Sequence, residues 1–108
     1  MTHEENARNN HRSGYNCAQS VNIAYAEELG LSPVDAMREA PKPRSDGGKC
    51  GAFLAGRELL AKLRPEAVEA FEREFLNQYG AVECKKLRMI GCNDLVGTAA
   101  RLVEELDR

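Results

Sequence analysis

The sequence predicts an all-α protein, a small helical bundle of about four main helices plus one or two short helices. Three observations support this fold class. Apolar residues recur at helical spacing in most segments, and glycine or proline separates these segments. No segment shows the strict alternation or the tight turn that predicts a β-hairpin. The chain of 108 residues can bury one core but not two, so we expect a single domain over residues 13–108.

The first half of this domain is expected to form two helices and a loop. An apolar stripe at helical spacing begins at Cys17 and ends at Gly30, a residue type that commonly terminates helices. A short second helix is predicted from Ser32, which is a favourable N-cap and precedes a proline at the first helical position. Residues 40–49 (APKPRSDGGK) have no apolar anchor after the first alanine and are predicted to be a loop.

The second half is expected to contain two long helices, a brief helical piece and a final helix. Cys50 opens the third helix, and Pro65 starts a fourth that ends at Gly80. A short helical piece is predicted over residues 84–89, and the last helix begins near Cys92. The apolar stripes of the three main helices are Phe53, Gly56, Leu60 and Leu63; Val68, Phe71, Phe75 and Tyr79; and Leu95, Val96, Ala99, Leu102, Val103 and Leu106.

Composition and charge exclude several classes of function. A net charge of −2 provides no basic stripe, so we expect no nucleic-acid partner. No apolar run approaches the roughly 18 residues that a membrane helix requires. Residues 1–12 are polar and lack the apolar stretch of a secretory signal, so we expect a flexible leader and a cytoplasmic protein. The two histidines, His3 and His11, fall in this leader and are expected to be solvated.

The four cysteines are the main source of chemistry in the sequence. In a reducing cytosol, such cysteines indicate metal binding, redox chemistry or buried free thiols more often than structural disulfides. Cys50 is the candidate reactive thiolate, because a helix N-terminus and the neighbouring Lys49 would lower its pKa. Gly47, Gly48 and Gly51 would leave the backbone open to a metal, a cluster or a second sulfur, which makes them candidate cofactor-binding residues.

Spacing alone does not bring the cysteines together. Cys84 and Cys92 would be about 12 Å apart on one unbroken helix, given a rise of about 1.5 Å per residue. Gly91 interrupts the helix between them and lets the chain turn. The sequence contains no C-x-x-C pair, so it matches neither a zinc ribbon nor a thioredoxin signature. Inert core thiols are the competing interpretation, because free cysteines are often buried.

Taken together, the motifs resemble a family of redox-active proteins that is defined by four cysteines around a C-G-A-x-x-G motif. The resemblance extends from about Gly14 to Leu106. The matching residues are Gly14-Tyr15-Asn16-Cys17-Ala18-Gln19-Ser20-Val21, Gly47-Gly48-Lys49-Cys50-Gly51-Ala52, Tyr79-Gly80, Cys84, Leu87, Cys92, Val96, Ala99 and Ala100. One departure is that the last glycine of the motif is replaced by Ala55, with Gly56 one position later. The segments at 40–46 and between Cys84 and Cys92 also look shorter than is usual in that family.

The resemblance implies a helical module whose cysteines are redox-active or hold a metal centre. The leading hypothesis is that Cys17, Cys50, Cys84 and Cys92 converge, either to ligate an iron–sulfur cluster for electron transfer or to cycle between dithiol and disulfide. A redox partner protein is expected, and an apolar face left over by a short bundle would allow a homodimer. The alternative is a structural module stapled by zinc or a disulfide, which binds a partner protein and has no redox role.

Overall fold

The computed structural model describes residues 2–108, which form α-helices, one 3₁₀-helix and no strands. The predicted all-α fold class is therefore confirmed. The elements are α1 (His3–Arg12), α2 (Cys17–Ala24), α3 (Ala26–Leu29), α4 (Pro33–Glu39), α5 (Ser45–Gly48), α6 (Gly51–Leu63), η1 (Pro65–Ala67), α7 (Val68–Tyr79), α8 (Cys84–Leu87) and α9 (Cys92–Leu106). Within these residues, no helix is both long enough and apolar enough to cross a membrane.

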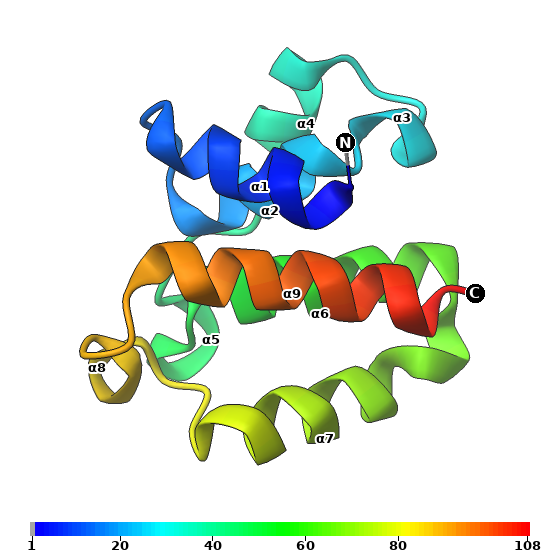
Figure 1. Ribbon diagram of the computed structural model, residues 1–108. Helices are drawn as coiled ribbons and strands as arrows, with labels where there is room; N and C mark the ends of the chain where they lie inside the picture. The colour runs from blue at the N-terminus through cyan, green and yellow to red at the C-terminus, as the bar shows by residue number, and fades with distance from the viewer. Residues whose placement is uncertain (1) are drawn as a thin grey trace.

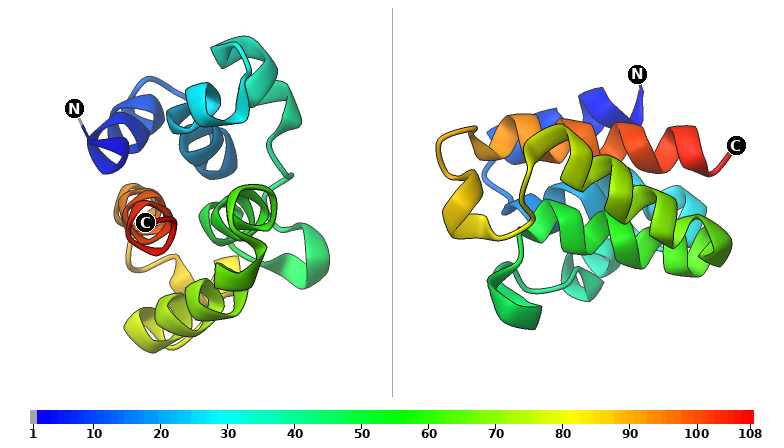
Figure 2. Two further views of the ribbon diagram at one scale, coloured as in Figure 1. Left: turned by 90° about the vertical axis from the view of Figure 1, so that its right-hand side faces the viewer. Right: turned by 90° about the horizontal axis from the view of Figure 1, so that it is seen from below.

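The main helices are arranged in three layers (Figures 1 and 2). Helices α6 and α9 lie side by side in the middle, α1 and α2 cover one side, and α7 covers the other. Helices α2, α6 and α9 all begin at the same end of the bundle, which is the left-hand end in Figure 1. Their N-termini are consequently brought together although they are far apart in the sequence.

Three phenylalanines form the aromatic part of the core between α6 and α7. The rings of Phe53 and Phe75 lie 5.2 Å apart between centroids, and Phe71 lies 5.7 Å from Phe53. A Cβ atom on Gly56 would lie 2.3 Å from Cζ of Phe71, so only glycine allows this approach of the two helices. Gly56, which follows Ala55 in the sequence, therefore serves the contact between α6 and α7.

The first predicted helix is divided into two. Asn16 caps α2, since its side chain accepts a hydrogen bond from the N–H of Gln19 at 2.8 Å. The helix then stops at Tyr25 (φ −108°, ψ 15°), and α3 follows as a separate turn that ends at Gly30. The predicted loop at 40–49 likewise contains a short turn, α5, in which Asp46 and Gly47 have left-handed backbone conformations.

The flexible leader predicted for residues 1–12 is wrong from His3 onward, where the chain forms α1; Met1 lies outside the described residues. Thr2 and Glu5 cap this helix reciprocally. Ala7 is fully buried, and α1 packs on α2 and α9. The helix has little apolar surface and is held by polar contacts instead, so a search for apolar stripes does not detect it.

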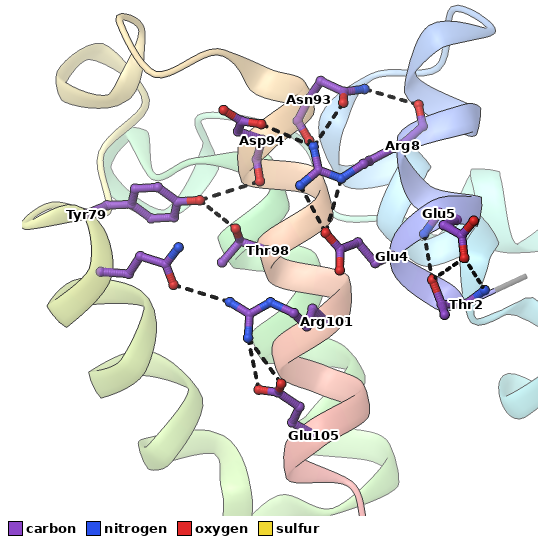
Figure 3. Close-up of polar contacts among 11 residues, drawn as sticks. Thr2, Glu4, Glu5, Arg8, Tyr79, Asn93, Asp94, Thr98, Arg101 and Glu105 are labelled. Atoms are coloured by element: carbon purple, nitrogen blue, oxygen red, sulfur yellow. Dashed lines mark hydrogen bonds and ion pairs between the residues drawn. The ribbon is translucent and has the colours of Figure 1, made fainter.

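Arg8 provides the main polar contact of α1 with the start of α9 (Figure 3). Its guanidinium donates to Glu4 Oε2 at 3.0 Å, Asn93 Oδ1 at 3.2 Å and Asp94 Oδ1 at 3.1 Å. The side-chain amide of Asn93 donates back to the carbonyl of Arg8 at 3.1 Å. These bonds fix α1 against the first turn of α9, next to Cys92.

His3 is also placed differently from the sequence-based expectation. Its ring stacks on Tyr25 at 4.1 Å and lies between the carboxylates of Glu28 and Glu104, with Nδ1 2.5 Å from Glu104. Partial burial disfavours the charged imidazolium, but the hydrogen bonds to the two carboxylates outweigh this effect and raise the pKa of His3. This histidine therefore joins α1 to α3 and α9 rather than lying free in solvent.

Candidate thiol site

All four cysteines lie at helix starts, and three of these starts belong to the same end of the bundle. Cys17, Cys84 and Cys92 are the first residues of α2, α8 and α9, and Cys50 directly precedes α6. Figure 1 shows α5 and α8 at this end as well, and α8 directly precedes α9 along the chain. No disulfide joins the cysteines in the structure.

The sulfur of Cys17 rests on the first turn of α6. A Cβ atom on Gly51 would lie 2.4 Å from Cys17 Sγ and 3.1 Å from Pro43, so this position must be glycine for the sulfur to sit there. Burial raises the pKa of Cys17, and the charge of Cys92 raises it further. The backbone N–H groups of the two helix starts act in the opposite direction but do not outweigh burial.

Cys50 is the most buried of the cysteines, with 3% of its surface exposed. Its N–H donates to the carbonyl of Val82 at 2.7 Å, and Lys49 forms an isolated antiparallel bridge with Glu83. The segments that lead into Cys50 and Cys84 are thus paired side by side. This pairing connects the loop before α6 to the loop before α8.

The expectation of a lowered pKa for Cys50 is wrong. Burial raises the pKa of this thiol to about 11, and the charges of Cys17 and Cys84 act in the same direction. The N–H groups at the start of α6 oppose these effects without reversing them. Lys49 gives little help, because its ammonium donates to the backbone carbonyl of Asp46 at 2.8 Å and lies 3.7 Å from the Asp46 carboxylate.

The four thiols differ in burial and influence one another electrostatically. The charge of Cys92 raises the pKa of Cys17, and the charges of Cys17 and Cys84 raise that of Cys50. Cys84 is half-buried and Cys92 is exposed. Within residues 2–108, however, no three Cys, His, Asp or Glu side chains are grouped closely enough to hold a metal ion. The side chains of residues 2–108, as placed, therefore do not form a site for a single metal ion.

A cavity of about 260 Å³ opens beside Cys84, between α5 and α8. Gly47 and Gly48 form part of its wall, so two of the candidate cofactor-binding glycines lie here, while Gly51 lies under Cys17. The remaining lining residues are Arg44, Glu83, Lys85 and Arg88. The cations Arg44, Lys85 and Arg88 were not identified from the sequence as part of the site. The lysine after Cys84 was a visible signal, but Arg44 enters the site only through the fold of the loop.

Comparison with known proteins gives one match. A family model described as "Putative redox-active protein (C_GCAxxG_C_C)" matches residues 15–106, which include all four cysteines. Helix α1 precedes the matched segment. No curated protein and no solved structure matches the chain.

Proposed function

Because this chain belongs to the C_GCAxxG_C_C family of redox-active proteins, we propose that it is a small thiol redox protein that cycles between a dithiol and a disulfide. The observation that carries this proposal is geometric: the sulfur of Cys17 rests on Gly51, directly after Cys50, and the segment before Cys84 pairs with the segment before Cys50. Cys17 and Cys84 are therefore the two candidate partners of Cys50 in an internal disulfide.

The burial of Cys50 supports a role as the resolving thiol rather than the attacking one. The attacking species in disulfide exchange is the thiolate, and a pKa of about 11 keeps Cys50 protonated near neutral pH. An oxidant would therefore react first at the half-buried Cys84, whose segment pairs with that of Cys50. Cys50 would then displace the reduced product, and the protein would lose two electrons and two protons in total. A redox partner protein would return the electrons.

A metal centre is the alternative proposal. Four thiolates commonly ligate an iron–sulfur cluster or zinc, and the four helix starts here all carry cysteine. For zinc, this alternative requires the sulfurs to move closer together, because no three side chains within residues 2–108 are placed to hold a metal ion. For this reason we place the dithiol–disulfide couple first.

The test is to purify the protein anaerobically, analyse it for iron, sulfide and zinc, and then titrate its redox state. Free thiols are counted by alkylation and mass spectrometry in buffers of defined thiol–disulfide potential. We expect metal-free protein that loses two alkylatable thiols in one step, and peptide mapping should locate the new disulfide at Cys50. The variants Cys17→Ser and Cys84→Ser identify the partner of Cys50, because only one of them should abolish the two-thiol step.

Cys92→Ser serves as the control, since Cys92 is exposed and is not a neighbour that affects Cys50. This variant should keep the two-thiol step. Stoichiometric iron with sulfide would replace the proposal with the cluster alternative, and tightly bound zinc would favour the structural module. Four thiols that stay alkylatable at every potential would mean that the cysteines are inert.

A further inference from the structure

We propose that the cavity beside Cys84 binds the anionic group of a small carboxylate-bearing disulfide and directs its sulfur to Cys84. This inference rests on the proposed thiol redox function and adds the class of oxidant and the point of entry. It is carried by the cavity, by the charge of its walls and by the position of Cys84 among them.

The size of the cavity sets the size of its occupant. Its volume of about 260 Å³ lies just below the range of about 300–1,000 Å³ that is typical of small-molecule pockets. A protein partner cannot enter such a space, but part of a small molecule can. Its walls come from α5 and α8, and the sulfur-bearing residue Cys84 is one of the lining residues.

The charge of the walls selects the chemistry of the occupant. Arg44, Lys85 and Arg88 line the cavity, and within residues 2–108 none of them forms an ion pair with a carboxylate. Glu83 is the only lining carboxylate, and it lies 3.4 Å from the ammonium of Lys86. The cavity is thus a local positive site on a protein whose net charge is −2. Such a site attracts an anionic ligand and repels a cationic one.

The paired segments around Cys50 connect the cavity to the inner thiols. In the antiparallel bridge between Lys49 and Glu83, Cys50 lies opposite Val82, so Cys50 and Cys84 are diagonal neighbours on the two paired segments. The thiolate of Cys84 would attack one sulfur of the bound disulfide RSSR, forming a mixed disulfide with the protein and releasing RS⁻ with the electron pair. Cys50 would then give its proton to solvent and attack the Cys84 sulfur, which releases the second RS⁻. The protein loses two electrons, and RSSR becomes two thiols.

The experiment compares three small disulfides that differ in charge. The reduced full-length protein is mixed with 3,3′-dithiodipropionate (a dianion), 2-hydroxyethyl disulfide (neutral) or cystamine (a dication). The protein used for the rates carries Cys50→Ala, so that the mixed disulfide at Cys84 is not resolved. The rate at which this adduct forms is measured by acid quenching and peptide mass spectrometry. Each rate is divided by the rate of the same reagent with a model cysteine peptide. We expect the dianion to react at least about fivefold faster than the neutral reagent, and the dication to react more slowly than either.

A charge variant and a matched control locate the effect. The variant carries Arg44→Gln, Lys85→Gln and Arg88→Gln, which neutralises the cavity. The control removes the same number of exposed cations elsewhere, with Arg38→Gln, Lys62→Gln and Arg73→Gln. Circular dichroism checks that both are folded. The ratio of the normalised rate for the dianion to that for the neutral reagent should fall to about one in the cavity variant and stay unchanged in the control.

The outcomes separate this inference from the function it rests on. Equal normalised rates for the three reagents in the Cys50→Ala protein with an unaltered cavity would overturn the proposed selection of anions, as would a preference for the dianion that survives in the cavity variant. The redox function would still stand if the neutral reagent produced an internal disulfide in the wild type. Conversely, a charge-selective adduct at Cys84 that Cys50 never resolves would support the cavity and overturn the dithiol–disulfide couple.

Discussion

Gly51→Ala tests how the start of α6 holds the sulfur of Cys17. A methyl group at this position would lie 2.4 Å from Cys17 Sγ, whereas ordinary contacts are about 3.5–4.0 Å, so the sulfur or the helix must move by about 1.1 Å. Pro43 lies 3.1 Å away on another side and limits how the methyl group can be accommodated. Such overpacking typically costs about 1–3 kcal/mol, and a glycine-to-alanine gain in helix propensity offsets at most about 1 kcal/mol.

The displaced sulfur should react faster with alkylating reagents. Moving it off α6 removes the burial that raises the pKa of Cys17, and it also removes backbone N–H groups that favour the thiolate. Burial is the larger of the two effects, so the pKa should fall and the thiolate fraction should rise. The assay is the rate of iodoacetamide labelling at Cys17 in the folded protein, followed by peptide mass spectrometry, with the free energy of unfolding from urea denaturation.

Gly56→Ala is the matched control for this experiment. It adds a methyl group to the same helix at a similarly close distance, 2.3 Å, but from Phe71 in the aromatic core rather than from a sulfur. Both variants should lose stability, and only Gly51→Ala should change the labelling rate of Cys17. If the rate is unchanged in Gly51→Ala, or rises equally in both variants, the argument that Gly51 positions this thiol is wrong.

Three further predictions concern the elements that frame the site. Asn16→Ala removes the cap of α2 and should lower the free energy of unfolding in urea by about 1 kcal/mol; an unchanged value would argue against the cap. Tyr25→Phe should cost about 1–2 kcal/mol, because the buried hydroxyl donates to the carbonyl of Ala100 at 2.8 Å; unchanged stability would argue against this bond. The raised pKa of His3 means that the folded protein binds the proton more tightly than the unfolded chain. The contribution of His3 to the free energy of unfolding is therefore full below about pH 6.5 and is lost as the pH rises through the pKa of His3 in the folded protein. Urea denaturation of the wild type and of His3→Gln should therefore show a larger difference in the free energy of unfolding at pH 5.5 than at pH 8.5.

The sequence by itself determined the helical fold and pointed to the four cysteines as the candidate site. Periodic apolar residues such as Phe71 and Phe75 predict helices because a helix presents one stripe to the core, and these residues are fully buried in the structure. The position of each cysteine at a helix start was also predicted from local signals, such as the glycines around Cys50. Helices and their starts are set by residues that are close together along the chain, which is why they can be predicted from the sequence.

Polar contacts between distant segments were not predictable in this way. Helix α1 has only one fully buried apolar residue, Ala7, and is fixed by Arg8 through bonds to residues more than eighty positions away. No local pattern specifies such partners. The same applies to His3, whose two carboxylate partners come from α3 and α9.

Only the tertiary structure decided the electrostatics of the thiols. A helix start and a nearby lysine predict a low pKa for Cys50, but the fold buries this thiol and turns Lys49 towards Asp46, so desolvation dominates and the pKa rises. The fold likewise placed Arg44 beside Cys84, forty positions along the chain. Burial and long-range charge depend on which segments pack together, and this information resides in the packing rather than in any local stretch of sequence.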